Sequence, residues 1–179
     1  DGKEINFSNG RGYIEKDWGV GFPSAWIWFQ SNHFSDCKFD KIYMDPAKIS
    51  LTLSIAIVPF LKKKIKGFIV GLLLDDKLYK FTPYEGGILE KVLVDSKNVT
   101  ISIKNNKHSM EIVINRTEQF GVLYAPDKED MLPKVNESIF SKAVVNLYDN
   151  GNGKKLIFSG IARIGALELV GDIDKLITV

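Results

Sequence analysis

The chain has 179 residues, a formal net charge of +2, 45% hydrophobic residues and 26% charged residues. This length suits one large domain, and the composition is ordinary for a soluble globular protein. The small net charge and the scarcity of arginine argue against a nucleic-acid partner. Cys37 is the single cysteine, which excludes an internal disulfide framework and a cysteine-based zinc site.

The apolar runs of the chain are all short. None approaches the roughly 20 residues that a membrane-spanning helix needs, so we expect no transmembrane segment. The chain begins Asp-Gly-Lys without a methionine, and we expect it to be the interior of a longer protein. A lone cysteine fits a reducing compartment, and we therefore expect a cytoplasmic location.

Taken in chain order, the first signal is Asn9-Gly10, the dipeptide that most favours a tight hairpin turn. Strands are predicted on either side of it, at residues 5–8 and 11–14. Residues 15–23 lack periodicity and are predicted to form an ordered loop. A strand rich in aromatic residues follows at residues 25–33.

Residues alternate between the two faces of a strand, so the aromatic strand at 25–33 has two different surfaces. One face carries two indoles followed by two amides, at Trp26, Trp28, Gln30 and Asn32. The other face carries Ile27, Phe29, Ser31 and His33. Buried amides need hydrogen-bond partners, so the first face is more typical of a pocket lining than of a plain core.

Further short strands are predicted along the rest of the chain. Residues 50–58 alternate between apolar and small polar side chains, which indicates a half-buried strand. Residues 125–137 are polar and are predicted to form a loop with a helical turn. The other expected strands are residues 68–74, 77–82, 88–94, 99–104, 109–115, 120–124, 139–148, 155–164 and 167–170.

The pattern as a whole is about ten strands spaced by roughly 8–12 residues, without a convincing amphipathic helix. It predicts an all-β fold, an antiparallel lipocalin-like (calycin-type) β-barrel of about 8–10 strands. We expect residues 1–179 to form a single domain of this kind. A barrel of that size can enclose one small ligand.

Four lysines after Pro59 form the most basic local cluster, namely Lys62, Lys63, Lys64 and Lys66. A solvated loop between two strands is the simplest interpretation of this cluster. Contact with a membrane surface is the alternative, because basic segments are attracted to anionic lipid head groups.

Several familiar catalytic motifs are absent from the sequence. It has neither a glycine-rich phosphate loop ending in Lys-Ser/Thr nor a Gly-x-Ser-x-Gly motif. His33 and His108 are the two histidines, and they are far apart in the sequence. A metal centre would therefore rest mostly on carboxylates, and we expect each histidine to have a surface or strand-face role.

The most distinctive stretch is GYIEKDWGVGFPSAWIWFQSNHF, at residues 12–34. It resembles the tocopherol cyclase family, whose signature runs Glu-Lys-Asn/Asp-Trp-Gly, Phe-Pro, Trp-x-Trp and Gln-x-Asn. Residues 77–86 (KLYKFTPYEG) and the stretch 146–168 are also similar to the family. The signature matches at Glu15, Lys16, Trp18, Gly19, Phe22, Pro23, Trp26, Trp28, Gln30, Asn32 and Phe34.

The resemblance implies a specific reaction without a cofactor or metal. Tocopherol cyclases close a chromanol ring by protonating the side-chain alkene of a prenylated benzoquinol, after which the phenolic oxygen adds to the tertiary centre. The resemblance also implies that this chain is the C-terminal half of a longer two-domain protein, whose N-terminal half is a partner. A hydrophobic small molecule is the expected ligand.

Residue roles follow from matching these residue types to the reaction. An alkene is a weak base, so the acid must lie against it in a dry pocket, and Glu15 or Asp17 would supply it. Aromatic faces stabilise the developing positive charge, a role for Trp18, Trp26 and Trp28 beside Phe22. Amide groups at Gln30 and Asn32 would hold the quinol hydroxyls. Asp17 replaces the asparagine of plant members, which favours Glu15 as the acid.

Two alternatives to a cyclase stay open at the level of sequence. The first is a non-catalytic barrel that binds or carries a hydrophobic ligand. The second is a structural or interaction domain whose core is filled by its own tryptophan and phenylalanine side chains. The same charged residues at 15–17 would then form a solvated loop or a salt-bridged corner.

Overall fold

The computed structural model describes residues 2–8, 10–16, 22–61, 63–127 and 130–179. Its strands are β1 (Ala25–Phe39), β2 (Ile42–Tyr43), β3 (Ile49–Phe60), β4 (Lys63–Leu74), β5 (Lys77–Phe81), β6 (Ile88–Val94), β7 (Asn98–Lys104), β8 (His108–Asn115), β9 (Gly121–Asp127), β10 (Asp130–Asp149) and β11 (Lys155–Gly171). Three short 3-10 helices accompany them, η1 (Pro46–Lys48), η2 (Pro83–Glu85) and η3 (Ile173–Leu176).

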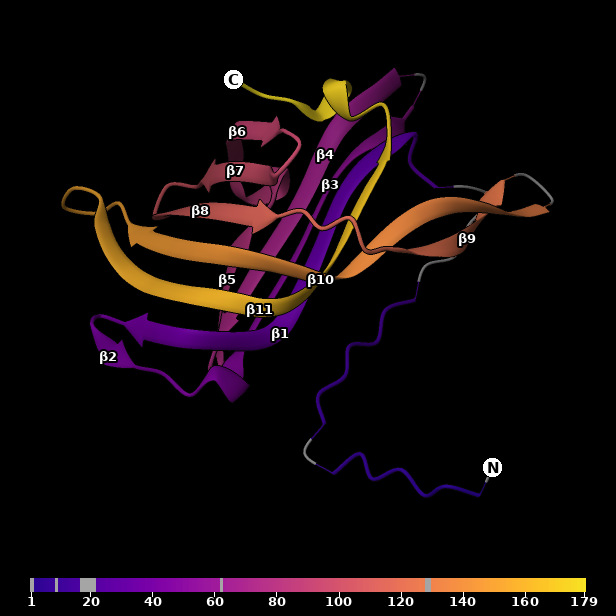
Figure 1. The fold of residues 1–179 in the computed structure, drawn as a ribbon. Coiled ribbons are helices and arrows are strands. Elements are labelled where there is room, and N and C mark those ends of the chain that lie inside the picture. Colours follow the sequence, from indigo (N-terminus) through magenta and orange to yellow (C-terminus); the bar gives the residue numbers. More distant parts are fainter. Residues whose placement is uncertain (1, 9, 17–21, 62, 128–129) are drawn as a thin grey trace.

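All these strands belong to one antiparallel, 11-stranded sheet, which confirms the predicted all-β antiparallel class (Figure 1). The order is β5-β4-β3-β1-β11-β10-β8-β7-β6, with β2 beside β1 and β9 beside β10. The sheet is not closed into a barrel, because the described residues of β5 and β6 form no ladder with each other. Near this opening, the Asn105 amide donates to the Lys80 carbonyl at 3.3 Å.

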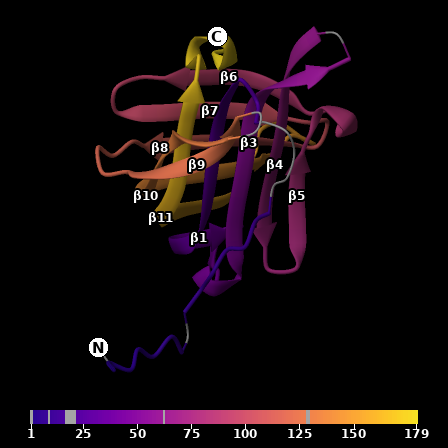
Figure 2. The same ribbon diagram turned by 90° about the vertical axis from the view of Figure 1, so that its right-hand side faces the viewer.

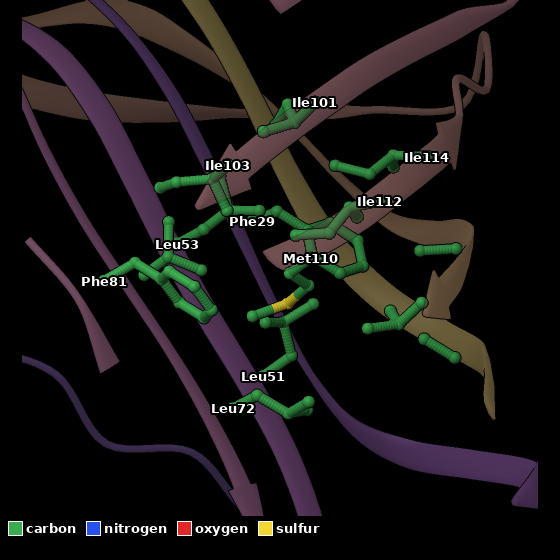
Figure 3. Packing of buried hydrophobic residues seen from close by; sticks show 14 of the residues in the cluster. Phe29, Leu51, Leu53, Leu72, Phe81, Ile101, Ile103, Met110, Ile112 and Ile114 are labelled. Carbon is green, nitrogen blue, oxygen red and sulfur yellow. The ribbon is translucent and has the colours of Figure 1, made fainter. Parts of the chain in front are cut away.

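The sheet curves so that β7 and β8 face β3, β4 and β5 across one hydrophobic core (Figures 1 and 2). The inward side of each strand supplies every second residue, as the period-two pattern requires. In Figure 3, Phe29 of β1 packs among aliphatic residues of β3 and β4 and of the facing strands β7 and β8. Phe29, Phe81 and Phe158 are fully buried. The concave side of the sheet is therefore filled by side chains.

Gly165 of β11 shows how tightly this core is packed. A Cβ atom added there would lie 2.5 Å from two ring carbons of Phe29 and 3.1 Å from the Gln30 carbonyl oxygen. The missing side chain is what allows the Phe29 ring to lie flat against β11. The sequence predicted two strands separated at this glycine, but β11 continues through it.

Two other local predictions are wrong. The described residues of 125–137 are not a loop, because 125–127 end β9 and 130–137 begin β10, paired from Asp130↔Asp127 to Glu137↔Gly121. Pro126 lies on an edge strand and Pro133 in a two-stranded extension, where the missing N–H groups are tolerated.

The second wrong prediction concerns the N-terminal hairpin. Gly10 donates to the Phe7 carbonyl at 3.0 Å, but the described residues of 5–8 and 11–14 form no strand. An isolated two-stranded hairpin is marginal in water. Residues 2–8 instead extend away from the sheet (Figure 1), whereas Arg11 and Gly12 are hydrogen-bonded to Asn32 of β1.

Candidate functional site

Strand β1 presents different surfaces to the two sides of the sheet. Ile27 and Phe29 are fully buried in the main core. Trp26 and Trp28 lie on the opposite, convex face and belong to a second, smaller cluster. The alternation that the sequence predicts for residues 26–29 is therefore present in the structure.

The β9–β10 hairpin covers part of this convex face. Ala125 of β9 and Val135 of β10 pack with Trp26 and with Ala56 of β3. Strand β10 can do this because it changes partner along its length. It pairs with β9 from Asp130 to Glu137 and with β8 from Lys142 to Asp149.

A cleft of about 490 Å³ lies between this hairpin, the convex face of β1 and the N-terminal segment. Aromatic side chains from three parts of the chain line it. The Phe22 and Trp26 rings meet edge-on at 5.7 Å and 81°. The Tyr13 and Trp28 ring centroids lie 5.9 Å apart, and Tyr124 of β9 lines the far side.

Three carboxyl groups also line the cleft, on Glu15, Glu137 and Glu168. Glu137 of β10 and Glu168 of β11 are cross-strand partners, and Glu168 is in turn the partner of Trp28. Partners of this kind have Cβ atoms about 4.5–5.5 Å apart on one face of the sheet. The two carboxyl groups and the Trp28 indole therefore form one row across three strands.

The environments of these carboxyl groups differ. The Trp26 indole N–H donates to Glu168 Oε2 at 2.6 Å. Burial raises the pKa of Glu137 above its ordinary value, because removal from water disfavours its charged form. Glu15 is exposed, and its carboxylate accepts a hydrogen bond from the Tyr13 hydroxyl.

The structure brings together four of the residues that sequence predicts for the site. Glu15, Phe22, Trp26 and Trp28 all line the cleft. Asp17 and Trp18 lie outside the described residues.

Gln30 and Asn32 do not line the cleft. The pairing of β1 with β11 shifts register between Gln30 and His33, so the simple alternation ends there. Gln30 is buried, with 8% of its surface exposed. The Asn32 amide donates to the Gly12 carbonyl at 2.9 Å, and the Asn32 carbonyl accepts from Arg11 at 2.9 Å. Asn32 thus fixes the N-terminal segment beside β1.

Sequence reasoning missed Glu137 and Glu168. Glu137 falls in the stretch that the sequence predicts to be a loop, where no strand alternation indicates the face on which its side chain lies. Glu168 alternates with Leu167 and Leu169 in a strand, and a charged residue flanked by apolar neighbours was the available signal. Tyr13 and Tyr124 gave no comparable signal.

The described residues contain no group of three or more His, Cys, Asp and Glu side chains that could hold a metal ion. His108 lies outside the cleft, with its ring edge-on to Tyr79 at 5.0 Å and 87°. Within the described ranges, no helix has the length and apolar character needed to cross a bilayer.

Fold and cleft together define an all-β protein whose single antiparallel sheet carries an aromatic, carboxyl-bearing cleft on its convex face. The family model described as tocopherol cyclase-like matches residues 1–171. The chain belongs to the tocopherol cyclase-like family, which confirms the resemblance seen in its sequence.

Two curated plant proteins are similar to the chain. It is 26% identical over 177 residues to the probable chloroplastic tocopherol cyclase of Oryza sativa subsp. japonica, covering 96% of this chain and 36% of that protein. It is 24% identical over 182 residues to the chloroplastic tocopherol cyclase of Zea mays, covering 96% of this chain and 35% of that protein. The chain thus spans about one third of the length of these relatives. No solved structure matches it.

Proposed function

We propose that the chain binds a prenylated benzoquinol-type ligand in the convex-face cleft and promotes its cyclisation by proton transfer. The observation that carries this proposal is the raised pKa of Glu137, a carboxyl group inside an aromatic cleft. The similarity to two plant tocopherol cyclases supports the choice of reaction class.

The chemistry requires an acid that is protonated near neutral pH and lies next to an apolar substrate. Glu137 would give its proton to the side-chain alkene, forming a C–H bond and leaving a tertiary cation. The phenolic oxygen would then form the C–O bond and lose its own proton to a carboxylate, either Glu137 or Glu168. Atoms balance within one molecule, so the reaction is an isomerisation and consumes no co-reactant.

Glu15, the acid favoured by the sequence, is retained as the second candidate. Its carboxylate lines the same cleft, but Glu15 is exposed and lies on the N-terminal segment, whereas Glu137 is half-buried on β10. Asp17 stays a candidate on sequence grounds alone. A direct comparison of variants at Glu137 and Glu15 separates the two described acids.

The indole rings would stabilise the cationic stage. A cation over the face of tryptophan gains about 0.5–1 kcal/mol when exposed and about 2 kcal/mol when desolvated. Trp26 and Trp28 lie on the same face as the Glu137–Glu168 pair. Phe22 and Tyr13 extend this aromatic lining toward the N-terminal segment.

We further propose that the remaining part of the whole protein completes the site. The chain covers about one third of its plant relatives, and the cleft has a side that the described residues leave open to solvent. Water must be excluded for a carboxylic acid to protonate an alkene. A second domain over the cleft would supply that exclusion.

The test is incubation of the full-length protein with a prenylated benzoquinol, with chromanol product measured by chromatography. We expect Glu137→Gln to lower the rate by about 10²–10⁴, the usual contribution of a general acid. Glu90→Gln is the matched control, since Glu90 pairs with Lys104 on β6 and β7, away from the cleft. Unchanged turnover in Glu137→Gln with a large loss in Glu15→Gln would assign the acid to Glu15.

A carrier function is the second candidate, and the open side of the cleft favours it, because binding a hydrophobic ligand does not require the exclusion of water that alkene protonation needs. A carrier would bind the quinol and quench tryptophan emission without forming chromanol. Two of the three tryptophans line the cleft, so their fluorescence reports occupancy. Quenching without product in the full-length protein would replace the cyclase proposal with the carrier.

A further inference from the structure

The hairpin between β3 and β4 ends in a large apolar tip that nothing described in the structure covers. The two strands pair in register as far as Phe60↔Lys63. Phe60 is 58% exposed and Leu61 is 91% exposed. Figure 2 shows this hairpin extending beyond the neighbouring strands.

The backbone at the tip is unusual for the residue that occupies it. Leu61 has φ = 54°, in the left-handed region that glycine, asparagine and aspartate tolerate best. The turn at the other end of β4 provides a comparison, because Asp75 has φ = 55° there. Aspartate tolerates that conformation, and its charged side chain is well hydrated at an exposed turn. Leucine at position 61 has neither advantage, so neither turn geometry nor burial accounts for it.

Basic side chains surround this apolar tip. Lys63 and Lys64 are exposed, and neither takes part in an ion pair among the residues that the structure describes. Lys66 has a different task, since its ammonium group donates to the carbonyls of Leu176 and Ile177 and to Thr178 Oγ1. It ties the base of the hairpin to the C-terminal segment.

We propose that the β3–β4 tip docks the protein onto an anionic lipid surface. Phe60 and Leu61 enter the interface between head groups and acyl chains, while Lys63 and Lys64 remain at the level of the phosphates. Apolar insertion combined with basic flanks is the pattern of interfacial membrane binding. Charge complementarity selects anionic lipid, since each lysine near such a surface contributes about 1 kcal/mol, or about fivefold in affinity.

The tip lies on the same face of β3 as the cleft. Residues two apart share a face, so Phe60 follows Val58, Ala56 and Ser54 in one row. Ala56 and Val58 pack in the convex-face cluster with Trp26, and Ser54 lines the cleft. Six residues of strand span about 20 Å. A protein docked by this tip therefore holds Ser54, one of the residues that line the cleft, about 20 Å from the lipid surface.

The test is sedimentation of the protein with vesicles of phosphatidylcholine containing one third phosphatidylglycerol. We expect binding that is lost in pure phosphatidylcholine and weakened by high salt, which screens charges on this length scale. Lys63→Gln/Lys64→Gln should weaken binding by about 25-fold at low salt. Leu61→Ser should weaken it by about tenfold with little change in salt dependence, because it removes apolar contact only.

Lys38→Gln/Lys142→Gln is the matched control, because both lysines are exposed and lie on β1 and β10 away from the tip. Far-UV circular dichroism and thermal unfolding check that each variant folds. Equal binding by Leu61→Ser and the native chain would overturn the proposal. So would unchanged sedimentation without anionic lipid, or a tip-dependent dimer in light scattering without vesicle binding. The docking surface does not depend on the proposed reaction, so each can fail alone.

Discussion

The hydrogen bond from Trp26 to Glu168 is expected to stabilise both the fold and the cleft. Trp26→Phe keeps an aromatic ring against Phe22 but removes the indole N–H that lies 2.6 Å from Glu168 Oε2. A hydrogen bond to a charged group contributes about 1.5–3 kcal/mol when well buried. Glu168 is only partly buried, so we expect a loss of about 1–2 kcal/mol in the free energy of unfolding.

The assay is thermal and urea unfolding of a double-mutant cycle. A change of 1 kcal/mol shifts Tm by about 2–4 °C for a chain of this size, so Trp26→Phe should lower Tm by about 2–8 °C. Combining it with Glu168→Ala should reveal a coupling energy of about 1–2 kcal/mol. Trp28→Phe is the control, since its indole donates no hydrogen bond among the described contacts. Additivity of Trp26→Phe and Glu168→Ala within about 0.5 kcal/mol would refute the reasoning.

Three further predictions concern the cleft acid, the core glycine and the cysteine. The raised folded-state pKa of Glu137 means that unfolding releases protons, so its contribution to stability falls as pH rises from the ordinary glutamate pKa through the folded value. Glu137→Gln should therefore raise Tm at pH 8 and lose this advantage toward about pH 4, and an advantage that grows on acidification would contradict the sign. Gly165→Ala should cost about 1–3 kcal/mol by forcing the Phe29 ring aside, whereas Gly121→Ala, with open space around its Cβ, should change urea unfolding little. Burial raises the pKa of the Cys37 thiol to about 11, so a thiol reagent at pH 8 should react only after denaturant unfolds the chain.

Sequence reasoning located most strands because their inner faces carry a regular period. Residues 88–94 were predicted as a strand and form β6 with the same bounds, and residues 50–58 lie inside β3. The alternation at Trp26, Ile27, Trp28 and Phe29 also gave the correct division between cleft and core. Such signals are local, and the structure preserves them.

What sequence could not provide depends on contacts between distant segments. The change of partner along β10 places Glu137 beside Glu168, and nothing near residue 137 indicates that neighbour. The register shift after Gln30 removes Asn32 from the row of Trp26 and Trp28, although the alternation of types continues. The sequence predicts a closed barrel, but the sheet is open between β5 and β6, because pairing between the two edge strands of a sheet leaves no local pattern in the sequence.

The division of β1 into two faces has a consequence for how the protein can change. Ile27 and Phe29 pack in the main core, while Trp26 and Trp28 line the cleft on the other side of the same strand. Adjacent residues of β1 are therefore constrained by different contacts. Under the proposed function, a substitution at Trp28 changes the ligand that the cleft accepts without repacking the main core, whereas a substitution at Trp26 also removes its bond to Glu168. A designer seeking altered specificity would vary position 28 first and leave Ile27 and Phe29 fixed.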